Sequence, residues 1–148
     1  MIRCRRKSKL RSKAGHDKPN CLMDLLLDTH AFVWWDGDNT KLSRSAFAAI
    51  TEPTNRVFIS VATIWESAIK KRTGRLYFPA SPLEAAARNG FLMLAITGQH
   101  AEAAAELPLI HKDPFDRLLV AQAQLSELTL VTTDAAIRLY DVAIMSAK

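Results

Sequence analysis

Strand-like and helix-like segments alternate along this sequence from Asp24 to its C-terminal end. The strand-like segments are "DLLLD" (24–28), "RVFIS" (56–60), "FLMLAI" (91–96) and "LTLVTTD" (128–134), with "VAIMS" (142–146) as a candidate fifth strand at an edge. This alternation is typical of an α/β domain with a central, mostly parallel sheet. We therefore predict an α/β fold with four to five strands.

The predicted helices follow from apolar spacing and capping residues. In "VATIWESAIKKRTG" (61–74), apolar side chains recur every three to four residues, and Gly74 is a natural stop. Asp113 is a suitable N-cap for "DPFDRLLVAQAQLSE" (113–127), in which Pro114 takes the first helical position. The other predicted helices span 29–35, 43–50, 81–90, 99–107 and 135–141.

The net charge of +5 is divided unevenly along the chain. Residues 1–22 carry eight basic side chains against one acidic, a net charge of +7, whereas residues 23–148 carry 12 basic and 14 acidic side chains, or −2. We expect a disordered basic extension over 1–22 and one folded domain over 23–148. Two alternatives stay open for the extension: a nucleic-acid-binding arm, or a natural translation start at Met23.

The composition, 49% hydrophobic and 24% charged, is that of a soluble globular protein. No apolar run approaches the ~20 residues that a membrane-spanning helix requires, and charged residues interrupt any secretory signal. The two cysteines, Cys4 and Cys21, both precede the predicted domain, which excludes a disulfide framework or a cysteine zinc site within it. We expect a cytoplasmic protein.

Four acidic side chains stand where strands end or where the following helices begin. Asp28 ends the first strand and Asp134 the fourth. Glu66 lies in the first turns of the helix after the second strand, and Asp116 lies in the first turn of the helix at 113–127. In a parallel α/β sheet these points share one edge, where ligands bind. The four carboxylates are therefore predicted to converge.

Each acid also has a structural explanation when it is taken alone. Asp28 and Asp134 could cap the helices that follow them, and Asp116 suits the positive end of a helix dipole. Thr63 and Glu66 match the spacing of a capping box. The occurrence of all four acids at one edge is what favours a functional site.

Crowded carboxylates repel one another and take up protons unless a cation neutralises them. His30, His100 and His111 share no metal-ligand spacing. Only His30, two residues past Asp28, is a candidate for a role at the site, and a structural hydrogen bond is the role expected for it. Oxygen ligands alone favour Mg²⁺ or Mn²⁺. Such an ion can polarise a phosphoryl oxygen and activate water for attack on a phosphodiester.

Four segments resemble, in order and spacing, the PIN-domain nucleases, and among them the VapC-type toxins of bacterial toxin–antitoxin pairs: "LLLDTHAFVWW", "ISVATIWESAIKKRTGRL", "DPFDRLLVAQAQ" and "LTLVTTDAAI". The resemblance covers nearly all of residues 23–148. It implies a PIN-like α/β/α sandwich and a Mg²⁺- or Mn²⁺-dependent endoribonuclease. It also implies a homodimer that a cognate antitoxin holds inactive. Single-stranded or looped RNA is the expected substrate because its bases and backbone are more accessible than those of a duplex.

Carried over position by position, the metal-binding and catalytic acids of the family fall on Asp28, Glu66, Asp116 and Asp134, with Asp113 as an accessory acid. Thr29 and Thr132 are candidates to orient a ligand, a water or the substrate. Arg72 and Arg75 are candidates to bind substrate phosphates. Charge balance within their helix, including a pair between Lys70 and Glu66, is the structural alternative. Trp34, Trp35 and Trp65 fit a core or a dimer interface better than base stacking.

Two other functions remain open at this stage. A small-molecule phosphohydrolase would form an aspartyl-phosphate on Asp28, but it would need a second carboxylate close by, and His30 stands where that acid is first sought. A non-catalytic module that binds RNA or a protein partner would not need carboxylates at all four positions.

Overall fold

The structure is a computed structural model, and it describes residues 22–148 of the chain. The predicted basic extension lies outside the described residues except for Leu22, so the expectations for it stay predictions. Within the described part, no helix is long and apolar enough to cross a lipid bilayer.

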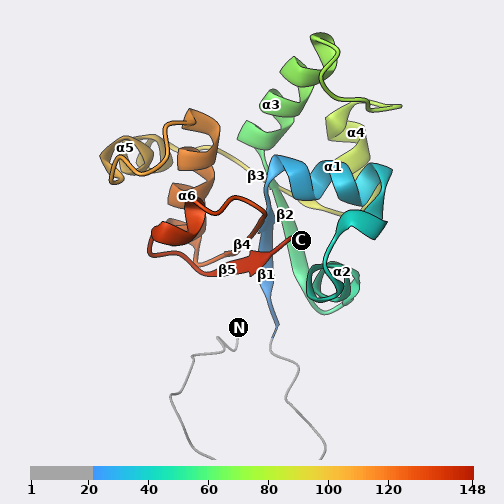
Figure 1. Ribbon diagram of the computed structural model, residues 1–148, viewed down its shortest axis with the longest axis horizontal. Coiled ribbons are helices and arrows are strands. Elements are labelled where there is room, and N and C mark those ends of the chain that lie inside the picture. The colour runs from blue at the N-terminus through green and yellow to red at the C-terminus, as the bar shows by residue number, and fades with distance from the viewer. Residues whose placement is uncertain (1–21) are drawn as a thin grey trace, which may run out of the picture.

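The sheet has five strands in the order β3-β2-β1-β4-β5, and all four pairings are parallel (Figure 1). The strands are β1 (Asp24–Leu27), β2 (Arg56–Ser60), β3 (Leu92–Leu94), β4 (Thr129–Thr132) and β5 (Ile144–Ser146). The predicted α/β class, the parallel sheet and the fifth strand at an edge are confirmed. The third strand is shorter than predicted, since only three of its six residues pair.

The α-helices are α1 (Thr29–Gly37), α2 (Arg44–Thr51), α3 (Val61–Arg72), α4 (Pro82–Arg88), α5 (Gly98–Glu106) and α6 (Pro114–Ser126). Two 3₁₀ turns, η1 (Asn39–Lys41) and η2 (Ile137–Leu139), complete the set. The α-helix predicted over 135–141 was wrong, because only the three residues of η2 are helical there and they form a 3₁₀ turn. The predicted stop at Gly74 fits its positive φ of 76°, a conformation that glycine adopts without strain.

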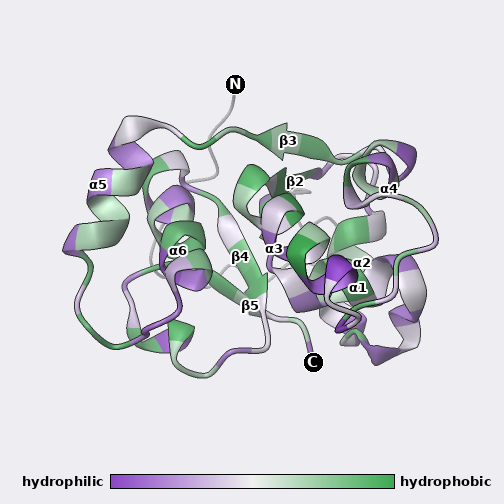
Figure 2. Ribbon diagram, turned by 90° about the horizontal axis from the view of Figure 1, so that it is seen from above, coloured by the Kyte–Doolittle hydropathy of each residue, from purple (hydrophilic) through white to green (hydrophobic). Residues whose placement is uncertain are grey.

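Helices cover both faces of the sheet (Figures 1 and 2). Helices α1, α2 and α4 lie on one side and α5 and α6 on the other, while α3 stands at the carboxyl edge of the strands. Side chains of β1 alternate between the two cores: Leu25 and Leu27 pack with Phe32 of α1, and Leu26 packs with Leu119 of α6. This period of two explains why a central strand reads as an unbroken apolar run.

A buried polar contact joins the two sides at the end of β2. Ser60 is the N-cap of α3, where its Oγ accepts the N–H of Ala62, and the same hydroxyl donates to Oε1 of Gln122 at 2.5 Å. Gln122 is fully buried in α6, and its amide donates to the carbonyl of Ala95. The contact fixes the start of α3 relative to α6, the two helices that carry Glu66 and Asp116.

We expect Leu26→Ala to lower the free energy of unfolding by about 2–5 kcal/mol, because it leaves a cavity in a core that excludes water. Leu26 is completely buried in the central strand, whereas Leu125 of α6 is 52% exposed. Leu125→Ala is therefore the matched control, with a change near zero. Urea denaturation followed by circular dichroism measures both, and equal losses in the two variants would contradict this assignment of the core.

Candidate metal centre

Asp28 is buried at the end of β1, and both of its carboxylate oxygens accept hydrogen bonds. Oδ1 accepts the backbone N–H of Ala31 at 2.8 Å, so Asp28 is the N-cap of α1 as the structural alternative predicted. Oδ2 accepts the hydroxyl of Thr132 at 2.6 Å, from the end of the neighbouring strand β4. Burial raises the pKa of Asp28 above its ordinary value, although the hydrogen bonds from Thr132 and Ala31 oppose that shift.

Glu66 lies in the second turn of α3 and is also buried. Its Oε2 accepts the hydroxyl of Thr29 at 2.7 Å, and its Oε1 pairs with the Lys70 ammonium at 2.6 Å, as predicted. The predicted capping box of Thr63 and Glu66 was wrong, because Ser60 caps α3. Glu66 is therefore held by a neighbour of Asp28 and by one lysine, and not by the start of its own helix.

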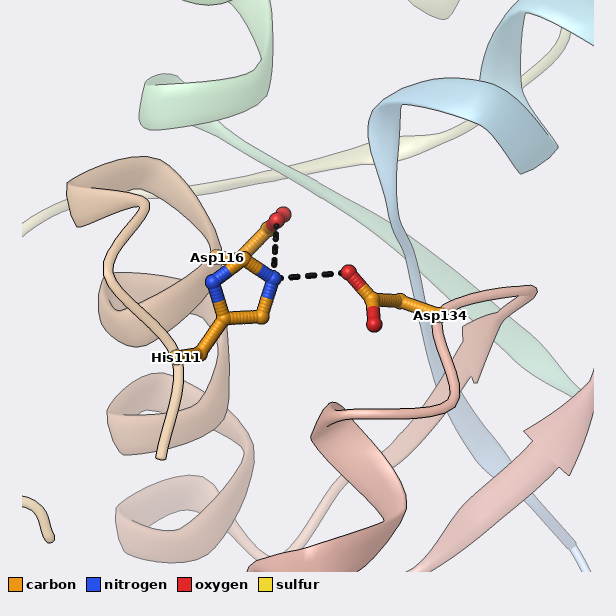
Figure 3. Close-up of side chains that lie close together, drawn as sticks. All are labelled: His111, Asp116 and Asp134. Atoms are coloured by element: carbon orange, nitrogen blue, oxygen red, sulfur yellow. Dashed lines mark hydrogen bonds and ion pairs between the residues drawn. The ribbon is translucent and has the colours of Figure 1, made fainter. Parts of the chain in front are cut away.

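Asp116 and Asp134 meet at a histidine that lies between them. Nε2 of His111 is 2.7 Å from Oδ2 of Asp134 and 3.0 Å from Oδ2 of Asp116 (Figure 3). Asp113 caps α6, and its Oδ1 accepts the backbone N–H groups of Phe115 and Asp116. Asp134 accepts the N–H of Ala136 through its other oxygen, so it also acts as a local cap.

The acids form one continuous polar chain along the carboxyl edge of the sheet. Thr29, which follows Asp28, donates to Glu66. Thr132 donates to Asp28 and accepts the N–H of Asp134, which is joined through His111 to Asp116. The charges of Glu66 and Asp28 also act on the carboxyl of Asp116. The four predicted carboxylates are thus brought together by segments more than 100 residues apart.

The pKa values reflect this crowding. Burial and the nearby charge of Asp113 raise the pKa of Asp116 to about 7, with smaller contributions from Glu66 and Asp28 in the same direction. Burial acts to raise the pKa of Asp134, but the hydrogen bond with His111 and the one from Ala136 keep it below its ordinary value. The cluster therefore divides into an acid that holds its proton to near neutrality and one that ionises readily.

The predicted hydroxyl and arginine positions fall in two different environments. Thr29 and Thr132 are buried and donate to carboxylates, so they orient Glu66 and Asp28. Arg72 ends α3 and Arg75 follows Gly74; both are exposed. Arg72 lies six residues beyond Glu66, about 9 Å along the helix axis.

The tryptophans differ among themselves. Trp34 and Trp35 are partly buried and pack against the core on the α1 side. Trp65 is 62% exposed, so the core half of its prediction was wrong and the dimer-interface half stays a prediction. Its ring makes an edge contact with Phe115 at a centroid distance of 5.3 Å. Trp65 precedes Glu66 and Phe115 precedes Asp116, so the aromatic pair joins the turns of α3 and α6 that carry these acids.

His111 is the residue at the site that sequence reasoning missed, and Arg117 helps to hold it in place. The buried guanidinium of Arg117 donates to five backbone carbonyls, those of Ala104, Ala105, Leu107, Pro108 and His111. Tyr140 donates to the carbonyl of Pro108 and accepts the N–H of His111. Together they fix the loop that carries His111, and the spacing of histidines and acids in the sequence gives no sign of this.

The residues present fit a hard divalent cation. Asp28, Glu66, Asp116 and Asp134 supply carboxylate oxygens, and each oxygen that accepts one hydrogen bond retains a second lone pair. Burial and, after it, the nearby charge of Asp113 raise the pKa of Asp116 to about 7, so ionisation of this carboxyl has a cost that a bound cation would relieve. Thr63 adds a buried hydroxyl with no hydrogen-bond partner among the described residues, one helical turn from Glu66. His111, Asp116 and Asp134 also offer one atom each within 4.8 Å of one another.

Comparison with family models matches residues 25–143 to the PIN domain. The chain therefore belongs to the PIN-domain family, as the resemblance in its sequence indicated, and this membership supports a nuclease activity. A search of curated proteins found no match.

Solved structures share the fold at low sequence identity. The crystal structure of VapBC2 from Rickettsia felis, bound to a DNA fragment from its promoter, matches with a TM-score of 0.61 and 15% identity over 85% of this chain and 100% of that chain. A toxin–antitoxin complex from Klebsiella pneumoniae matches with a TM-score of 0.56 and 21% identity over 82% of this chain and 96% of that chain. At these identities the similarity establishes the fold alone.

We expect Asp116→Asn to stabilise the metal-free protein above neutral pH. The carboxyl has a pKa of 3.8 when unfolded and about 7 when folded. Ionisation of Asp116 therefore lowers the free energy of unfolding. This loss of stability is absent below pH ~4, grows between pH ~4 and pH ~7, and is constant at higher pH. After allowance for partial solvent contact, the gain at pH 8 in EDTA is about 1–3 kcal/mol.

Urea denaturation at pH 4 and pH 8 measures this effect, with Asp141→Asn as the control because Asp141 is an exposed acid away from the cluster. Saturating Mn²⁺ should reverse the order of the two proteins, since a cation stabilises the ionised wild type. A gain that is the same at both pH values would mean that charge crowding is not its cause.

Proposed function

We propose that this protein is a metal-dependent endoribonuclease and the toxin of a toxin–antitoxin pair. The observation that carries the proposal is the polar chain that joins Glu66, Asp28, Asp134 and Asp116 at the carboxyl edge of the sheet. In this proposal the four carboxylates hold Mg²⁺ or Mn²⁺, and Asp113 assists them. When bound, the cation supplies Lewis acidity at a phosphoryl oxygen and activates water for phosphodiester hydrolysis.

The chain's own residues have distinct tasks in this proposal. Thr29 and Thr132 hold Glu66 and Asp28 in fixed orientations, so little reorganisation is needed when the substrate binds. Asp116, whose pKa is about 7, becomes fully ionised when a cation is present. Lys70 balances one negative charge of the cluster through its ion pair with Glu66.

Single-stranded or looped RNA is the substrate class that the surroundings of the acids favour. The exposed Trp65 ring and its neighbour Phe115 join the turns of α3 and α6 that carry Glu66 and Asp116, and in this proposal an unpaired base stacks on them while its phosphate meets the acids. Arg72 at the end of α3 and Arg75 just beyond it provide exposed positive charge for the following phosphates. The described domain carries more acidic than basic side chains, so these two arginines are needed for attraction to RNA.

The partner and location follow from the class of protein. The structural neighbours from Rickettsia felis and Klebsiella pneumoniae are toxin–antitoxin complexes, which supports a cognate antitoxin as the partner of this chain. A homodimer and a cytoplasmic location complete the proposal. An upstream reading frame that encodes a small antitoxin would support it over a housekeeping nuclease.

The rival phosphohydrolase is less well supported. Asp28 is buried, and position 30, where the second carboxylate of such an enzyme is first sought, is occupied by His30. A carboxylate in such a position suits a fixed ligand better than a nucleophile.

Purified protein should cleave a mixed single-stranded RNA with Mg²⁺ or Mn²⁺ and stop in EDTA. Asp28→Asn and Asp116→Asn should each lower the rate at least ~100-fold, since a bound metal ion contributes several kcal/mol to the transition state. Asp24→Asn is the matched control, because Asp24 stands at the opposite end of β1 and pairs with Arg56 at the surface. Equal cleavage by all variants, or cleavage in EDTA, would refute the mechanism.

Replacing both Arg72 and Arg75 by glutamine should raise KM for RNA with little change in kcat. Two lost phosphate contacts should also make the salt dependence shallower, by about 0.7 in the slope of log K against log salt for each contact. The control is Arg44→Gln, an exposed arginine at the start of α2. Fluorescence anisotropy with labelled RNA at several salt concentrations measures the slope; an unchanged slope would remove these two residues from the RNA path.

A further inference from the structure

The contacts of His111 leave two possible roles for its ring. Nε2 lies 2.7 Å from a carboxylate oxygen of Asp134 and 3.0 Å from one of Asp116, so position alone would allow the nitrogen to coordinate a cation with them (Figure 3). The same distances suit an N–H that donates to both acids. The two roles need the ring proton on different nitrogens.

The second ring nitrogen distinguishes between these roles. Nδ1 of His111 accepts the backbone N–H of Asp113 at 3.0 Å. A backbone N–H can only donate, so Nδ1 presents its lone pair there and the ring proton of the neutral imidazole lies on Nε2. A histidine that binds a metal through Nε2 carries its proton on Nδ1 and donates it to a carboxylate, a carbonyl or water. In this protein the group that faces Nδ1 is the N–H of Asp113, which is a donor and cannot accept a proton from the ring.

The ring is not free to exchange its two nitrogens. A half turn about the Cβ–Cγ bond would place carbon atoms where the nitrogens now meet Asp113 and the two acids. The backbone of His111 is also fixed, since its N–H donates to Tyr140 at 2.9 Å and its carbonyl accepts from Arg117 at 3.3 Å. A change of role would require the whole loop before α6 to move.

We infer that His111 is a positioning residue of the carboxylate site and not one of its metal ligands. Its Nε2–H donates to Asp134 and Asp116, and thereby links the acid after β4 to the acid in the first turn of α6. The inference rests on the proposed metal site for its functional meaning. The hydrogen-bond pattern of His111 involves protein groups only and does not depend on a bound metal.

Two spectroscopic measurements on the wild-type protein test the inference. Burial acts to lower the pKa of His111, but the hydrogen bond with Asp134 and the charges of Asp116, Asp134 and Asp113 outweigh it and raise the pKa above its ordinary value. Nitrogen-15 NMR of the metal-free protein, at a pH high enough for the ring to be neutral, should therefore show its single proton on Nε2, and the same form should persist with Mg²⁺. Pulsed electron paramagnetic resonance of the Mn²⁺ complex should show no coupling from a directly bound imidazole nitrogen. The signals of His111 are those that disappear in His111→Gln.

Variants test the positioning role. Calorimetric titration should show that His111→Ala weakens Mn²⁺ binding about 10–100-fold, the effect expected for loss of a residue that orients ligands. His111→Gln offers an amide N–H near the position of Nε2 and should recover most of that loss, which a general packing role would not predict. The Arg44→Gln control should bind Mn²⁺ like the wild type.

A directly bound imidazole nitrogen, a proton on Nδ1, or a glutamine variant as weak as the alanine variant would overturn the inference. If the wild type binds no cation, the proposed metal centre fails, but NMR of the metal-free protein still shows whether Nε2 is the donor. The two proposals can therefore fail separately.

Discussion

Asp28 places a buried carboxylate at the carboxyl edge of the sheet, directly after the apolar strand β1. An ionised oxygen is costly there unless hydrogen bonds or charges compensate it. The compensation comes from Thr132 at the end of β4 and from the first turn of α1. The central strand β1 lies between β2 and β4. Through these hydrogen bonds, the Asp28 carboxylate fixes the position of β1 relative to β4 and to α1. The other acids are arranged around it through Thr29 and the N–H of Asp134.

The site joins the two sides of the molecule. Glu66 comes from α3, whose start is tied to α6 by Ser60 and Gln122, and Asp116 comes from α6 itself. The loop before α6 is held by Arg117, a buried cation whose hydrogen bonds go to backbone carbonyls and not to the acids. A positive charge is thus buried near the cluster without neutralising any of its four carboxylates by direct contact.

Sequence patterns predicted the features that depend on neighbouring residues in the chain, such as strand ends and helix caps. The acids after β1 and β4 were found because parallel strands bring their carboxyl ends to one edge. Thr63 was misassigned as a cap because the spacing of a capping box also occurs one turn inside a helix, and Ser60 at the strand end takes that role. His111 was missed because its place is set by Arg117 and Tyr140, contacts that no spacing of histidines reveals.

The structural and functional explanations of the acids are compatible, contrary to how they first appear in the sequence. Asp28, Asp113 and Asp134 all accept backbone N–H groups as caps, yet a carboxylate has about four lone-pair sites and a cap uses one or two. A cap also fixes the direction of the remaining lone pairs, which is what an ion with demanding geometry needs. Asparagine caps a helix as well as aspartate but lacks the charge. Substitution by asparagine therefore separates the two contributions, whereas alanine would remove both and leave a loss of activity without a cause.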